Sequence, residues 1–150
     1  MITAEIAVES AALSLEQLAA AIGREPDAGR TIGSPSRVQP ARNYRSSLWV
    51  KNLEWDSSLH RGTDGHSFAV AALGDEFGDR LSALKLQGCN IVLSVVQDIA
   101  GERDEATLGI AFSEAAIEWL AWAKASISVD QYVVAVSQSC DALTSRQESH

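Results

Sequence analysis

The sequence predicts an α+β domain in which helices pack on one face of a mostly antiparallel sheet. Three observations lead to this prediction. Residues 2–8 alternate apolar and polar side chains with the period of a half-buried strand. Ser14 and Ser113 each precede a stretch with apolar residues at helical spacing. Several β-branched runs supply further strands, so the expected order is β-α-β-α-β-β-α-β.

The first helix has clear signals at both ends. Ser14 and Gln17 have the spacing of a capping box. Gly23, followed by Pro26, predicts where the helix ends. Residues 27–43 are rich in Gly, Pro, Ser and Arg, which indicates a long structured loop.

The second strand is expected from Tyr44 to Leu53. Tyr44, Leu48 and Val50 share one face of this strand, whereas Trp49 points to the other face. Either both faces are covered or the strand contains a bulge. We expect Trp49 to be largely buried, because large aromatic side chains on strands rarely leave both faces free.

The second half begins with a polar loop over residues 54–65 and a single helix from Ser67 to Leu86, with apolar residues every three or four positions. Strands are expected at Cys89–Val96 and Thr107–Phe112, joined as a hairpin by residues 97–106. A third helix then follows the capping serine at position 113.

The closing strand is expected at Ile127–Ser137. Within it we expect Tyr132 to be largely buried and Asp130 to be held by a backbone donor or an arginine. Residues 1–137 should form one domain, and the polar residues 138–150 a fraying tail.

The composition is that of one globular domain and excludes several classes of function. The chain has 150 residues, of which 46% are hydrophobic and 21% charged, and its formal net charge is −8. An acidic protein repels phosphate, so we expect no general binding to nucleic acid or to an anionic membrane. No apolar run reaches the roughly 20 residues that span a bilayer. The N-terminus lacks a signal-peptide pattern, and two cysteines are too few for a disulfide framework, so we expect a cytoplasmic protein.

No pattern in the chain predicts a metal site or covalent catalysis. His60, Asp64 and His66 lie close together, but they do not supply the converging ligands and second shell that a metal requires, and Arg61 would repel a cation. The chain lacks a Gly-x-Ser-x-Gly elbow, and the glycine spacing of residues 29–34 is not that of a phosphate loop. We therefore expect no metal, no cofactor and no enzymatic activity.

Basic and acidic residues are concentrated in different parts of the chain. Residues 28–51 contain five basic residues and no acidic one, and three of them could hold an anion with their planar guanidinium groups: Arg30, Arg42 and Arg45. Residues 97–118 are acidic and could steer a basic partner through Asp98, Glu102, Asp104 and Glu105. Alternatively, the arginines pair with the protein's own carboxylates.

Trp119 and Trp122 lie three residues apart on the third helix, so they cannot both face the centre of its apolar stripe. At least one should lie at the edge of the stripe, partly exposed. An exposed tryptophan of this kind is a frequent hot spot of protein interfaces, although it can also be the rim of a core.

Four spaced elements resemble a bacterial family known as domain of unknown function 4279. They are Leu18–Pro26, the run from Arg42 to Val50, the helix start from His66 to Phe77, and Val129–Tyr132. The resemblance covers about residues 2–134 and brings no catalytic residues with it. It implies a small cytoplasmic bacterial protein with an immunity or accessory role beside toxin systems. The loop at 33–41 and the Ala-rich third helix depart from the family pattern.

These observations favour a non-enzymatic binding protein, an immunity-type inhibitor that occludes a basic, toxin-like partner protein. The contact residues would be those of the acidic stretch together with the two tryptophans of the third helix. The alternative is a small-anion or nucleotide sensor, or an enzyme, that uses the arginine-rich loop over residues 30–45. The oligomeric state does not follow from the sequence.

Overall fold

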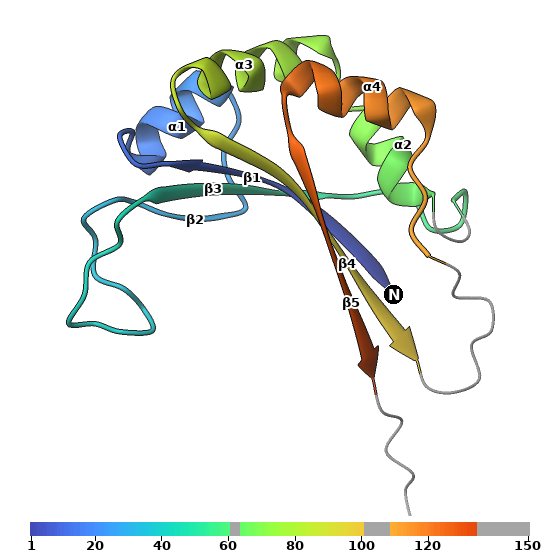
Figure 1. The fold of residues 1–150 in the computed structure, drawn as a ribbon, viewed down its shortest axis with the longest axis horizontal. Helices are drawn as coiled ribbons and strands as arrows, with labels where there is room; N and C mark the ends of the chain where they lie inside the picture. Colours follow the sequence, from blue (N-terminus) through green and yellow to red (C-terminus); the bar gives the residue numbers. More distant parts are fainter. Residues whose placement is uncertain (61–63, 101–108, 135–150) are drawn as a thin grey trace, which may run out of the picture.

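The computed structural model describes residues 1–60, 64–100 and 109–134. They form five strands and four helices (Figure 1). In chain order these are β1 (Ile2–Ser10), α1 (Leu15–Ile22), β2 (Ala28–Arg30), β3 (Ser47–Leu53), α2 (Gly65–Ala71), α3 (Asp75–Leu86), β4 (Asn90–Ala100), α4 (Glu114–Ala123) and β5 (Ser126–Val134).

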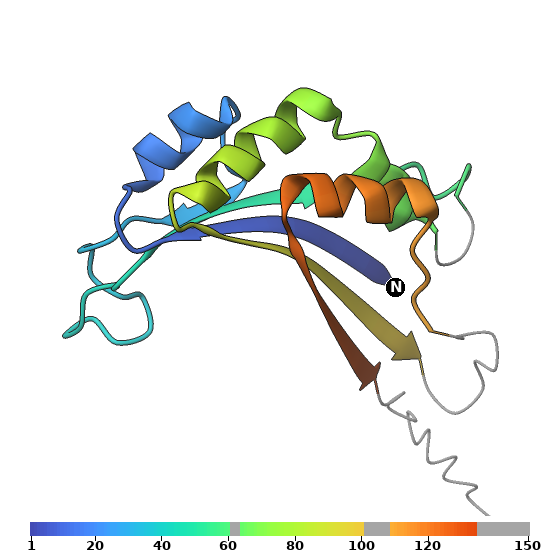
Figure 2. The same cartoon turned by 45° about the horizontal axis from the view of Figure 1, so that its top comes forward.

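The strands form one sheet in the order β2-β3-β1-β4-β5. β1 lies in the middle and pairs antiparallel with both β3 and β4, while β2 pairs antiparallel with β3. β4 and β5 pair in parallel. The helices lie together on one side of the sheet, and no described helix packs on its other face, which is called the uncovered face below (Figures 1 and 2). The predicted α+β class with a mostly antiparallel sheet is confirmed.

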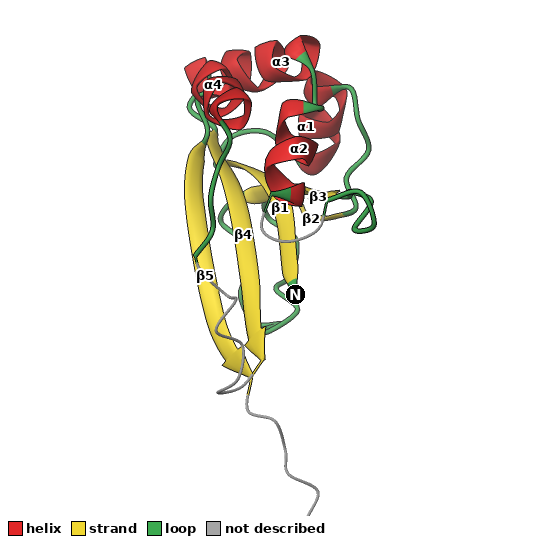
Figure 3. Cartoon of the chain, turned by 90° about the vertical axis from the view of Figure 1, so that its right-hand side faces the viewer, coloured by secondary structure: helices red, strands yellow, loops and turns green. Residues whose placement is uncertain are grey.

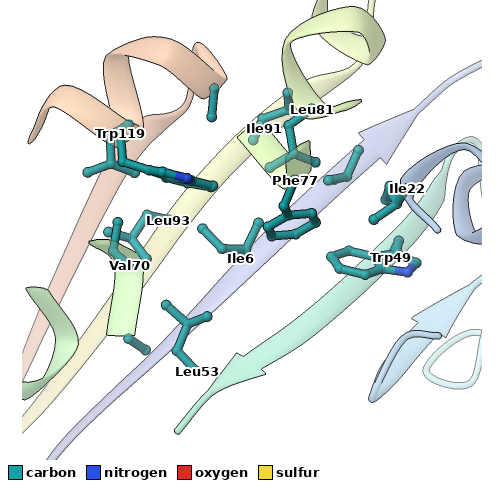
Figure 4. Close-up of a cluster of buried hydrophobic side chains, with 14 of the residues drawn as sticks. Ile6, Ile22, Trp49, Leu53, Val70, Phe77, Leu81, Ile91, Leu93 and Trp119 are labelled. Atoms are coloured by element: carbon teal, nitrogen blue, oxygen red, sulfur yellow. The ribbon is translucent and has the colours of Figure 1, made fainter. Parts of the chain in front are cut away.

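The core lies between the helices and the face of the sheet formed by alternate residues of the central strands. Ile6 and Val8 of β1 are fully buried, as are Ile91 and Leu93 of β4. Trp49 of β3 is also fully buried, as predicted, and its indole lies beside Phe77 of α3 (Figure 4). Val50, on the opposite face of β3, is also buried, whereas Leu48 and Asn52 on that face are half-buried and exposed.

Both ends of α1 and the start of α4 follow the predicted signals. The Ser14 side chain accepts a hydrogen bond from the Gln17 amide, and the Gln17 side chain accepts one from the Ser14 amide, which completes the capping box. Gly23 ends α1 in the left-handed conformation, with φ of 74°. Ser113 caps α4 by accepting from the Ala116 amide.

The single helix predicted over residues 67–86 is wrong, because the structure breaks it into α2 and α3. The break contains Gly74, which has φ of 85°, a backbone conformation that side chains disfavour. The Gly74 carbonyl accepts a hydrogen bond from Trp119 Nε1 of α4, at 2.9 Å. A tertiary contact therefore stabilises the break at the point where the apolar pattern predicted a continuous helix.

The predicted hairpin between the third and fourth strands is also wrong. β4 continues to Ala100 and pairs in parallel with β5, so α4 forms part of a crossover connection. Gly109–Phe112 belong to no strand, and the rest of the proposed strand at 107–112 lies outside the described residues. The second strand begins at Ser47 rather than at Tyr44, and the short β2 was not predicted.

The prediction that Tyr132 is buried is wrong, since 56% of this residue is exposed. Figure 3 shows why: β4 and β5 extend beyond the layer of helices, so no described helix covers the far end of β5. Asp130, also on β5, is exposed, and no described residue donates a hydrogen bond to its carboxylate. The predicted closing strand ended at Ser137, and positions 135–150, including the proposed tail, lie outside the described residues. Within the described ranges, no helix is long and apolar enough to cross a bilayer.

Candidate functional site

Trp122 is an exposed aromatic side chain that the structure holds in one position. It lies on α4, and 58% of the residue is exposed. Its Nε1 donates a hydrogen bond to Oδ1 of Asp79 on α3, at 2.8 Å. A Cβ atom at Gly78 would lie only 2.9 Å from Cδ1 of Trp122, so glycine leaves the room that the indole needs. The tryptophan is therefore both exposed and ordered.

Carboxylates surround this tryptophan on both helices. Asp75 lies one turn before Asp79 on α3, and Glu118 lies one turn before Trp122 on α4. A cation near the indole would meet an aromatic face and several negative charges. The α3–α4 surface formed by Asp75, Asp79, Glu118 and Trp122 thus has the chemistry expected for a basic partner.

Trp119 does not belong to this surface. Only 7% of it is exposed, and its ring lies 5.9 Å from that of Phe77 between centroids. The proposed role of Trp119 as a contact residue is corrected: it is part of the core. The prediction that at least one of the two tryptophans is partly exposed is confirmed by Trp122.

Of the four acidic residues predicted to contact a partner, the structure describes only Asp98. Asp98 is half-buried on β4, and its backbone pairs with Met1, whose amino group donates to the Asp98 carbonyl at 2.8 Å. Glu102, Asp104 and Glu105 lie outside the described residues.

The arginine-rich loop forms a projecting element, here called the arginine arm (residues 31–46). Its two sides are joined by backbone hydrogen bonds between residues 33 and 44 and between residues 36 and 42. Figures 1 and 2 show the arm extending from the start of β3, away from the helices. Arg37, Arg42 and Arg45 are exposed on it, and none of them forms an ion pair with a described carboxylate.

Arg30 differs from the arginines of the arm because it has internal partners. Its guanidinium lies 3.6 Å from the Glu9 carboxylate and 4.8 Å from the centre of the Tyr44 ring. The Tyr44 hydroxyl oxygen in turn accepts from the Arg37 amide, which lowers the pKa of Tyr44. Arg42 and Arg45 therefore lie on the arm, whereas Arg30 lies at its base and contacts Glu9 and Tyr44.

A groove of about 740 Å³, here called the acidic groove, lies at the opposite end of β3. Glu5 of β1 stands beside Asn52 of β3 and Ser94 of β4 in the sheet register. Thr3, Glu54 and Trp55 complete the polar and aromatic lining. This groove was not predicted, because its residues come from three strands and a loop that only the fold brings together.

The two histidines near the start of α2 have separate environments. His60 stacks on Phe68, with 4.1 Å between ring centroids. His66 is fully buried, and its Nε2 lies 2.8 Å from the Ala111 carbonyl. Asp64, the third residue considered for a metal, is exposed. No cluster of three metal-ligating side chains occurs within the described ranges.

Burial lowers the pKa of His66, which predicts a stability loss in mild acid. The unfolded chain takes up a proton near pH 6.5, whereas the folded chain resists it. The stabilisation is complete above that pH and is lost as the pH falls towards the folded pKa, at no more than about 1.4 kcal/mol per pH unit. Urea unfolding at pH 7.5 and pH 5 measures this loss. His66→Gln keeps a donor for Ala111 without titrating, so an unchanged pH dependence in this variant would contradict the assignment.

Residues 1–134 match a family model described as Domain of unknown function (DUF4279). No curated protein and no solved structure matches the chain. The matched region contains every described strand and helix, the α3–α4 surface, the arginine arm and the acidic groove. The chain therefore belongs to the DUF4279 family.

Proposed function

We propose that this protein is a binding protein that occludes a basic partner protein, in the manner of an immunity-type inhibitor. The observation that carries the proposal is the ordered, exposed indole of Trp122 among carboxylates on the α3–α4 surface. Tryptophan is among the residues most enriched at interface hot spots, where a few side chains supply most of the affinity.

The way Trp122 is held favours binding over incidental exposure. Its hydrogen bond to Asp79 and its position over Gly78 fix the ring before any partner arrives. A side chain already fixed in position loses less conformational entropy when it is buried in an interface. The neighbouring carboxylates would accelerate encounter with a basic protein and penalise an acidic one.

Trp122→Ala should abolish most of the affinity for the partner, with a loss of about 2 kcal/mol or more, expressed mainly as faster dissociation. The partner is sought by quantitative co-purification from the native host with wild-type protein and with the variant. A protein enriched only by the wild type is then purified, and its binding kinetics are measured at several salt concentrations.

Leu86→Ala is the matched control, because Leu86 is also exposed on the helical layer but lies at the far end of α3. It should bind like the wild type. Asp75→Asn should slow association and weaken its dependence on salt, because long-range attraction acts chiefly on the association rate. A partner whose affinity is unaffected by Trp122→Ala would contradict the proposal.

The anion-sensor alternative would depend on Arg42 and Arg45 of the arm, because Arg30 already has Glu9 as its partner. It predicts that their substitution abolishes ligand binding while Trp122→Ala has no effect. The co-purification and kinetic measurements separate these two outcomes.

A further inference from the structure

The uncovered face of the sheet has a basic end and an acidic end. Neither end is part of the α3–α4 surface, which lies on the helices. The arginine arm leads into the start of β3, and the acidic groove lies where β3 ends. Because β3 has seven residues, the two features are separated by roughly 20 Å along the strand. Within one copy, the arm and the groove are therefore at opposite ends of the same face.

The arm presents cations that have no ion-pair partner among the described residues. Its backbone is held by hydrogen bonds at both ends, among them Gly33 to Tyr44 and Ser36 to Arg42, so the arginines are displayed from an ordered support. Arg42 and Arg45 are exposed, and no described carboxylate lies within ion-pair distance of either. A guanidinium in this situation can bind a carboxylate without first breaking another ion pair.

The acidic groove has the complementary chemistry. Glu5 and Glu54 contribute two carboxylates, neither of which is ion-paired with a described basic residue. Asn52 and Ser94 add hydrogen-bonding groups beside Glu5, and the Trp55 indole supplies an aromatic surface. Carboxylates next to an aromatic ring are the groups that recognise the planar guanidinium of arginine.

We infer that two copies of this chain associate through these faces, with the arginine arm of each copy in the acidic groove of the other. A twofold axis through the middle of the face exchanges its two ends, so each basic end meets an acidic end and both contacts form together. Between them, the axis brings together half-buried apolar side chains of the central strands, including Ala7, Leu48 and Val92. A second copy of the chain carries both charge patterns, so its arm and its groove are complementary to the groove and the arm of the first copy.

Charge reversal at each end tests the inference with purified protein. One variant carries Arg42→Glu and Arg45→Glu on the arm, and the other carries Glu5→Arg and Glu54→Arg in the groove. Light scattering after size-exclusion chromatography should give a dimer for the wild type and monomers for both variants, because like charges then meet at each contact. The dimer dissociation constant should rise by about tenfold or more in either variant.

An equimolar mixture of the two variants should restore the dimer, since every reversed arm then meets a reversed groove. A single chain that carries all four substitutions should dimerise for the same reason. Lys85→Glu on α3 changes the net charge away from this face and should remain dimeric. Circular dichroism verifies that each variant is folded.

A wild-type protein that stays monomeric at high micromolar concentration would overturn the inference, as would assembly beyond a dimer or failure of the mixture to restore it. Trp122→Ala, on the helical side, should leave the dimer intact. The dimer and the partner-binding surface can therefore be tested and rejected independently.

Discussion

Trp49→Ala should lower the free energy of unfolding by about 3–5 kcal/mol, a large part of the stability of a domain of this size. The indole is fully buried and lies beside the Phe77 ring, with 6.2 Å between centroids. Its Nε1 also donates to the Arg24 carbonyl, at 3.1 Å, just beyond the end of α1. Alanine would leave a cavity under α1 and α3 and remove the donor for that carbonyl.

Urea unfolding followed by circular dichroism measures this change. Trp49→Phe is the informative control, because it keeps most of the buried apolar surface and removes only the hydrogen bond. Its loss should be clearly smaller than that of the alanine variant. A loss below about 1 kcal/mol for Trp49→Ala would mean that the side chain is not buried as described.

Trp119→Ala should have a similar effect, about 3–5 kcal/mol, for a related reason. Trp119 packs on Phe77 and donates to the Gly74 carbonyl, so it fixes α4 against the break between α2 and α3. The alanine variant would lose both the buried ring and the contact that holds this break.

Trp122→Ala is the matched comparison for this experiment, since both residues are tryptophans on α4. Trp122 is mostly exposed, so its loss should cost much less stability than the loss of Trp119. Equal stability losses in the two variants would contradict the distinction between a core residue and a surface residue.

Local sequence signals predicted the local features of the fold well. The alternation in β1 and the serine caps of α1 and α4 depend on neighbouring residues only, and the structure has them where expected. The break at Gly74 was missed because Val70, Leu73 and Phe77 continue the apolar stripe across it. Gly74 followed by two acidic residues is a helix-start signal, but the prediction gave more weight to the apolar stripe.

The remaining differences arise from contacts between distant segments. The sequence could not show that β5 pairs in parallel with β4, because a hairpin and a crossover both require two nearby apolar runs. Spacing showed that Trp119 and Trp122 differ in exposure, but the neighbouring α3 decides which one is buried. The acidic groove depends on sheet register, which no short motif records.

The central position of β1 has a consequence for biosynthesis. β1 lies in the middle of the sheet, but its pairing partners in β4 follow some ninety residues later in the chain. During synthesis, Ile6 and Val8 therefore have no partner on the β4 side of the strand until Leu93 and Ile91 have been translated. Nascent chains that end before β4 should expose an apolar strand to chaperones. Stalled chains that include β4 should become resistant to proteases.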